Sequence, residues 1–173
     1  IQLADETPFH IIAPAIHKDK LEVSKLFASK LGIDEIDDIQ QLGAVARRQL
    51  RTKFIEADMG ITGANFLVAD TGTLVVVSNE GNGRMCTSMP KVHVAIAGME
   101  RVIPSMSDLS TFLKLLIRSA TGQRISSYVS LVNGPRKTSE EDGPDEFHLI
   151  IVDNGRSKLL ENPELRESLN CIR

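Results

Sequence analysis

The sequence predicts an α/β domain of three layers, in which a mainly parallel sheet is flanked by helices. Apolar segments of strand length alternate along the chain with amphipathic segments of helical spacing, which is typical of this class. The segment Leu74–Val77 is a continuous apolar run rich in valine, which favours a strand buried on both faces. The length of 173 residues fits one domain that buries a full core.

Individual elements are predicted from periodicity and from residues that start or stop them. Gly32 and Gly122 each follow an amphipathic segment and are expected to end helices, and Ser107 is expected to cap one. The predicted helices are 18–31, 36–57, 63–69, 108–120, 157–160 and 163–169. The predicted strands are 9–13, 74–77, 92–97, 125–132 and 147–152.

Composition narrows the classes of partner and compartment. A formal net charge of -3 gives no reason to expect nucleic acid as a partner. No apolar run approaches the roughly 20 residues of a transmembrane segment, and no signal peptide opens the chain. Two cysteines in 173 residues favour a reducing compartment, so a cytoplasmic protein is expected.

The stretch Met59–Pro90 carries the strongest signal for a small ligand. Glycines let backbone amides face a ligand, and hydroxyls with one arginine would complete an anion-binding rim. The candidate ligand-binding residues are Thr62, Gly63, Thr71, Gly72, Thr73, Gly81, Gly83 and Arg84. The alternative, that these residues only form structural turns, stays open. A dinucleotide fingerprint fails because Cys86 occupies its third glycine position, and no P-loop sequence occurs.

Ligands of parallel α/β sheets bind beyond the carboxyl ends of the strands, where His17, the loop 78–84 and the turn 134–136 are expected. His17 is therefore the candidate catalytic acid or base. His93 and His148 lie within apolar strands, which favours hydrogen-bonded core histidines. The four histidines have no metal-ligand spacing.

Cys171 is the third residue from the end of the sequence. The run Cys171–Arg173 fits the first three positions of the cluster motif C-x2-C-x2-C-x3-C-P. By itself a lone cysteine is more simply interpreted as an inert thiol.

Several blocks taken together resemble a known family. They are IIAPAIHKD (11–19), the run from GITGANF to RVIPS (60–105), NGPRK (133–137), DGPDEFHLIIVDNGRSKLL (142–160) and ESLNCIR (167–173). Their order and spacing resemble the LUD domain of the lactate utilization protein B family. The resemblance implies a fold similar to the ribose-phosphate isomerase and CoA-transferase superfamily. It also implies a role in oxidising L-lactate to pyruvate, with a cysteine-rich cluster protein and a second LUD protein as sister subunits.

The resemblance also implies how the chain is organised. Residues 1–169 would form a LUD-type domain without its N-terminal part, and residues 170–173 would begin a truncated ferredoxin-like segment. Cys171 would be the first ligand of [4Fe–4S] clusters in the full-length protein, whereas no cluster is expected in this chain. An uncovered strand edge would favour a homodimer.

Three functions are therefore expected as alternatives. The first is a subunit of an L-lactate-oxidising oxidoreductase that passes electrons through iron–sulfur clusters beyond residue 173. The second is a transferase-like enzyme domain, or one that binds a small anionic metabolite such as an organic acid. The third is an interaction scaffold.

Overall fold

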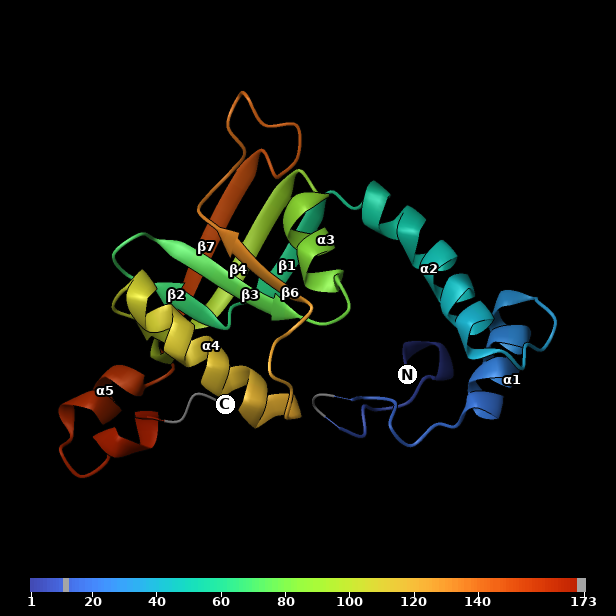
Figure 1. The fold of residues 1–173 in the computed structure, drawn as a ribbon, viewed down its shortest axis with the longest axis horizontal. Helices are drawn as coiled ribbons and strands as arrows, with labels where there is room; N and C mark the ends of the chain where they lie inside the picture. The colour runs from blue at the N-terminus through green and yellow to red at the C-terminus, as the bar shows by residue number, and fades with distance from the viewer. Residues whose placement is uncertain (11–12, 171–173) are drawn as a thin grey trace. The chain divides into compact units, whose positions relative to one another are not determined.

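The computed structural model describes residues 1–10 and 13–170. The chain divides into two compact units, residues 1–53 and 54–173 (Figure 1). The helices are α1 (Lys20–Leu31), α2 (Ile39–Glu56), α3 (Asn82–Ser88), α4 (Met106–Thr121) and α5 (Arg156–Glu161), with 3-10 turns at Gln2–Ala4, Met99–Arg101 and Arg166–Asn170. The strands are β1 (Met59–Gly63), β2 (Phe66–Val68), β3 (Thr73–Ser78), β4 (Val92–Gly98), β5 (Val102–Ile103), β6 (Tyr128–Val132) and β7 (Glu146–Val152).

In the first unit, helix α1 begins with a capping box. The Asp19 carboxylate accepts a hydrogen bond from the Glu22 N–H (2.8 Å), and the Glu22 carboxylate accepts one from the Asp19 N–H (2.9 Å). Gly32 ends the helix with a φ of 66°. The prediction of this helix is confirmed, although it starts at Lys20 rather than residue 18 because Asp19 is the cap.

The predicted strand at 9–13 is wrong for its described residues, since Phe9, His10 and Ala13 are not in a strand. The Phe9 N–H donates to the Pro14 carbonyl (3.0 Å), and Ala13 begins a turn closed by the Ile16 N–H (3.1 Å). Local turn hydrogen bonds therefore replace a ladder here. Residues 11–12 of this prediction lie outside the described part of the chain.

The second unit contains two sheets. Sheet A has the strand order β1-β4-β7 and is entirely parallel, and sheet B has the order β5-β2-β3-β6. In sheet B, β3 pairs antiparallel with both β2 and β6, while β2 and β5 are parallel. The α/β class with a parallel sheet flanked by helices is confirmed, and the mixed sheet B is an addition to it. Homodimer formation through an uncovered strand edge stays a prediction.

The segment 63–69, predicted as a helix, contains strand β2 and the end of β1 instead. Phe66, Leu67 and Val68 are all buried and hydrogen-bond to β3 on one side and β5 on the other. Aromatic and β-branched side chains suit such a strand. Pairing in the sheet therefore overrides the helical spacing that the sequence suggested.

The layers follow from two apolar clusters on opposite faces of sheet B. Helix α4 covers one face, and sheet A covers the other (Figure 1). The α4 cluster consists of Phe66, Val68, Val75, Ile103, Leu109 and Leu116, with Val77, Phe112 and Leu113 against it. The sheet A cluster consists of Leu67, Leu74, Val76, Ala95 and Ala97, with Ala64, Val132 and Phe147 against it. The predictions that Leu74–Val77 is buried on both faces and that α4 packs through its apolar stripe are confirmed.

Helix α4 starts at Met106, two residues before the predicted first residue 108. Ser105, not Ser107, occupies the N-cap position, and its hydroxyl donates to the Asp108 carboxylate (2.6 Å). Gly122 ends the helix as predicted, with a φ of 71°. Within the part of the chain that the structure describes, no helix is long and apolar enough to cross a membrane.

The segment after β3 also differs from prediction, because helix α3 begins at Asn82 inside the expected loop 78–83. Gly81, with a φ of 75°, precedes its first residue, and Met89 ends it just before Pro90. The helix therefore fits between the glycine and the proline. It lies against β1 and against Val76 of β3, whose Cγ1 would be 3.1 Å from a Cβ at Gly83.

Candidate functional site

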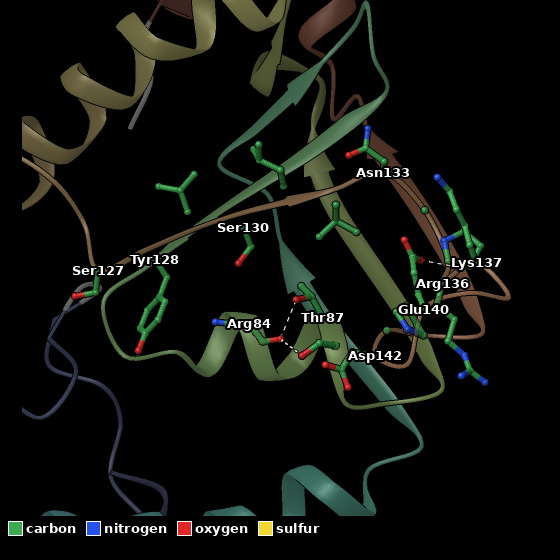
Figure 2. A pocket seen from close by; sticks show the side chains of 18 residues that line it. Arg84, Thr87, Ser127, Tyr128, Ser130, Asn133, Arg136, Lys137, Glu140 and Asp142 are labelled. Atoms are coloured by element: carbon green, nitrogen blue, oxygen red, sulfur yellow. Dashed lines mark hydrogen bonds between the residues drawn. The ribbon is translucent and has the colours of Figure 1, made fainter.

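The larger cavity beside α3 has a volume of about 890 Å³ and is called here the Arg84 pocket (Figure 2). It lies between α3, strand β6 and the loop that joins β6 to β7. Its polar lining includes Arg84, Thr87, Ser88, Ser127, Tyr128, Ser130, Asn133, Arg136, Lys137, Glu140 and Asp142. The loop is tied to α3, because the Gly143 N–H donates to the Ser88 carbonyl (3.2 Å). This tie fixes the wall of the pocket relative to the helix.

Arg84 is one of two cations of this pocket that are available to a ligand, and Lys137 is the other. The Arg136 guanidinium is occupied, since its Nε and Nη2 each lie 2.7 Å from Oδ1 of Asp145. Arg84 is exposed, and its guanidinium has no hydrogen-bond or ion-pair partner among the described residues. The Arg84 carbonyl accepts hydrogen bonds from the Thr87 and Ser88 hydroxyls (2.9 and 2.8 Å), which stabilise this turn of the helix (Figure 2). A guanidinium so placed suits a carboxylate or phosphate.

A second cavity of about 460 Å³, the Thr62 pocket, lies along another side of α3. The ends of β1 and β3 form its other walls. Its lining residues include Thr62, Gly63, Asn65, Ser78, Glu80, Asn82, Gly83 and Cys86. Thr62 Oγ1 lies 2.8 Å from Nε2 of His93, so His93 is hydrogen-bonded in the core as predicted. Burial raises the pKa of the Cys86 thiol, which makes it a poor nucleophile at neutral pH.

The residues of the predicted anion-binding rim do not lie together. They are divided between the Arg84 pocket, the Thr62 pocket and the turn between β2 and β3. Arg84 lines the Arg84 pocket, while Thr62, Gly63 and Gly83 line the Thr62 pocket. Gly81 adjoins the ring of Tyr128, which would lie 3.6 Å from an added Cβ. The binding roles of these residues stay predictions.

Thr71, Gly72 and Thr73 form the turn between β2 and β3, at the other end of β3 from Ser78. Thr73 and Ser78 are five positions apart along the strand, which corresponds to about 17 Å. Thr73 is buried, and its hydroxyl lies within hydrogen-bond distance of Thr71 Oγ1 (2.7 Å) and Asn133 Nδ2 (2.9 Å). These contacts stabilise the turn, and the structure does not bring this turn together with Gly81 and Gly83.

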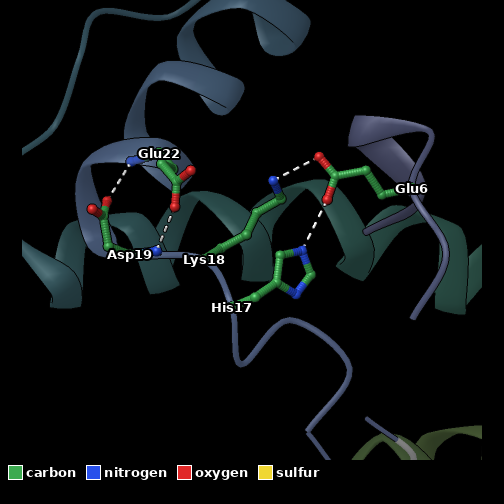
Figure 3. Close-up of polar contacts among 5 residues, drawn as sticks. All are labelled: Glu6, His17, Lys18, Asp19 and Glu22. Carbon is green, nitrogen blue, oxygen red and sulfur yellow. Dashed lines mark hydrogen bonds and ion pairs between the residues drawn. The ribbon is translucent and has the colours of Figure 1, made fainter. Parts of the chain in front are cut away.

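His17, the candidate acid or base, belongs to the first unit and lies in a turn before α1. Its Nε2 is 3.0 Å from Oε2 of Glu6, and Lys18 Nζ is 2.7 Å from Oε1 of the same carboxylate (Figure 3). Two hydrogen bonds lower the pKa of Glu6. The bond with His17 has the larger effect, and the bond with Lys18 has the next largest. The contacts give His17 a local structural role, and its catalytic role stays a prediction.

Several pocket residues were not singled out from the sequence. Tyr128 and Ser130 line the Arg84 pocket with the rest of strand β6. The sequence predicted this strand but did not identify it as the wall of a cavity. The turn 134–136, which was predicted to lie near a ligand, does line the Arg84 pocket.

The described residues do not fit an iron–sulfur cluster. Among them no group of three or more His, Cys, Asp or Glu side chains could hold a metal ion, and Cys86 is their only free cysteine. A [4Fe–4S] cluster is held by four thiolates. The predicted ligand Cys171 lies outside the described residues.

The fold and the two cavities beside α3 define an α/β domain suited to a small polar ligand. Residues 2–152 match the model of the LUD domain family. The chain belongs to this family.

Curated relatives cover the whole chain. Lactate utilization protein B of Oceanobacillus iheyensis is 46% identical over 173 residues, which are 100% of this chain and 36% of the relative. The proteins of the same name from Bacillus velezensis and Bacillus cereus strain AH820 are 47% and 48% identical, with the same shares covered. The chain therefore spans about a third of the length of these relatives.

One solved structure is similar over part of the fold. It is the crystal structure of a DUF162 family protein from Deinococcus radiodurans, with a TM-score of 0.44 and 17% identity. The similarity covers 58% of this chain and 57% of that protein. The expected likeness to the ribose-phosphate isomerase superfamily stays a prediction.

Proposed function

We propose that the chain takes part in lactate utilization as a domain of a larger cytoplasmic protein. The observation that carries this proposal is the identity of 46–48% over 100% of the chain to proteins named lactate utilization protein B. Because the chain spans 36% of those relatives, the complete activity requires parts of the protein outside residues 1–173. The cysteine content supports a reducing compartment.

The more specific proposal is that the whole protein passes electrons from L-lactate oxidation through [4Fe–4S] clusters bound after residue 169. The resemblance to the LUD family, which makes Cys171 the first ligand of a cluster segment, supports this proposal. Its partners would be a cysteine-rich cluster protein and a second LUD protein. Co-purification of the whole protein with both would support this assembly, and their failure to associate would contradict it.

Iron content tests the cluster proposal directly. Expressed with the residues that follow Arg173 in its gene and purified without oxygen, the protein is expected to contain iron and acid-labile sulfide and to absorb broadly in the visible range. Cys171→Ser in the same extended protein is expected to lower the iron content, because a thiolate ligand is lost. A colourless, iron-free extended protein would contradict the proposal.

The Arg84 pocket supports a second, compatible role, which is binding of a small organic acid. Arg84 offers a guanidinium without a protein partner at the wall of a cavity of about 890 Å³. The surrounding hydroxyl and amide groups of Ser130 and Asn133 can complete the hydrogen bonds of a carboxylate.

Removing the Arg84 charge is expected to weaken acid binding strongly. Binding of L-lactate, pyruvate or inorganic phosphate should raise the melting temperature of the wild type by mass action. Arg84→Gln should weaken that binding about 10- to 100-fold, since hydrogen bonds to charged groups contribute about 1.5–3 kcal/mol. Thermal-shift titration measures both constants.

The matched control is Arg118→Gln, which removes an exposed arginine from α4 outside the pocket lining. This variant should bind the same acid as tightly as the wild type. Equal binding of the acid by the Arg84→Gln variant and the wild type would show that the acid binds elsewhere. Absence of binding by the wild type would favour the scaffold.

A further inference from the structure

The contact between His93 and Thr62 joins the buried core to the Thr62 pocket. His93 is 0% exposed, lies in β4 and packs its ring against Phe147 with ring centroids 5.3 Å apart. Its Nε2 is 2.8 Å from Thr62 Oγ1, and Thr62 lines the pocket from the neighbouring strand β1. Thr62, a residue of the cavity wall, is thus held through its hydroxyl by a side chain that solvent does not reach.

Hydrogen-bond accounting assigns the tautomer of His93. Burial lowers the pKa of His93, so the imidazole is neutral and carries one N–H. Nδ1 is buried without a hydrogen-bond partner. An unpaired buried acceptor is less costly than an unpaired buried N–H, so the hydrogen belongs on Nε2. Nε2–H then donates to Thr62 Oγ1, which leaves the Thr62 O–H free to donate to a ligand.

Two amide groups add donors to the same pocket. Asn65 Oδ1 accepts from the Val77 N–H (2.7 Å), and Asn82 Oδ1 accepts from the Ser78 hydroxyl (2.9 Å). These bonds fix both carbonyl oxygens, while the amide nitrogens have no partner among the described residues. These two amide nitrogens can therefore donate to a ligand in this cavity.

The charge of the lining restricts the ligand further. Glu80 is the only charged side chain that lines the Thr62 pocket within the described residues, and no lysine or arginine does. An anion would meet a carboxylate and no cation here. The Arg84 pocket differs because it offers the cation Arg84. An uncharged molecule with carbonyl or hydroxyl oxygens matches a set of donors in these surroundings.

We propose that the Thr62 pocket binds a small uncharged carbonyl or polyhydroxyl compound. The Thr62 hydroxyl donates to an oxygen of this ligand, and His93 acts as a positioning residue that orients the hydroxyl. The amide nitrogens of Asn65 and Asn82 supply the remaining donors. This site is separate from the acid site at Arg84 and does not depend on it.

The first test is an NMR titration of the 173-residue protein with dihydroxyacetone and with glycerol. Binding is expected in the millimolar range, with shift changes at Thr62, Asn65 and Asn82 and at the ring of His93. Nitrogen spectra of the ring are expected to show a neutral imidazole protonated at Nε2. Failure of both compounds to perturb these residues, or a proton on Nδ1, would overturn the proposal.

Variants separate a binding role of the hydroxyl from a structural one. Thr62→Val keeps the branched shape and removes the hydroxyl, and it should bind the probe about 10-fold more weakly. Thr62→Ser keeps the hydroxyl and should retain binding within about twofold. Equal affinity of Thr62→Val and the wild type would overturn the proposal, and the wild-type spectra decide the matter if that variant does not fold.

Arg84→Gln separates this proposal from the acid site. The variant should bind dihydroxyacetone as the wild type does, although it should lose acid binding. If Arg84→Gln and Thr62→Val weakened dihydroxyacetone binding equally, the compound would not be bound in the Thr62 pocket alone. That result would overturn the assignment of the compound to the Thr62 pocket.

Discussion

Replacing Gly60 with alanine is expected to lower the free energy of unfolding by about 3 kcal/mol, at the upper end of the usual cost of overpacking. A Cβ at this position would lie 2.0 Å from the Cys86 carbonyl oxygen and 3.0 Å from Cγ of Pro90. The obstacle is the main chain of α3, which cannot rotate away as a flexible side chain can. Thermal unfolding should therefore begin at a temperature lower by roughly 10 °C.

Gly63→Ala is the matched control, since Gly63 lies in the same strand. A Cβ there would meet only the Ile96 carbonyl oxygen, at 4.0 Å. This variant should unfold within a few degrees of the wild type. Similar losses for both variants would mean that replacing either glycine of β1 is costly, and the close packing of α3 on Gly60 would not be the cause.

The second large effect concerns pH, because His93 is buried in its neutral form. Burial lowers the pKa of His93 below its usual value near 6.5, so below that pH the unfolded chain binds a proton that the folded chain does not. Stability is thus complete above about pH 6.5 and falls with decreasing pH until the folded-state pKa is reached. One proton corresponds to a slope of about 1.4 kcal/mol per pH unit. Urea unfolding between pH 5 and 8 measures this slope.

His93→Gln should remove that slope, although the variant should be less stable at neutral pH because the packing against Phe147 changes. His148→Gln serves as the control, since His148 is exposed and contacts Glu146 at 3.3 Å, so its prediction as a core histidine is wrong. A His93→Gln protein with the pH dependence of the wild type would show that His93 is not the group responsible.

Local signals in the sequence predicted the elements whose burial and termini are set by nearby residues. Helix α4 has an apolar stripe that ends at Gly122, and β3 is a valine-rich run, so both were predicted correctly. Strand β2 was missed because its three residues are stable only through pairing with β3 and β5. Helix α3, which lies between Gly81 and Pro90, was missed because its seven residues are too few to give a clear periodicity.

The site was predicted as one rim because its residues are close in the sequence. Thr73 and Ser78 lie at opposite ends of one strand, and α3 separates the lining of Arg84 from that of Thr62. The contact of Thr62 with His93 joins residues 31 positions apart, and the Arg84 pocket is completed by a loop from residues 133–144. Neither arrangement has a local signature, because both depend on which strands become neighbours.

The most direct test of the acid site is an NMR titration of the ¹⁵N-labelled protein with L-lactate. The amides of Arg84, Thr87 and Ser130 are expected to shift with a common dissociation constant, while those of α5 remain unchanged. Arg84→Gln should abolish these shifts without altering the rest of the spectrum. If the wild type showed no such shifts, or if the shifts persisted in Arg84→Gln, the assignment of the acid site to the Arg84 pocket would be contradicted.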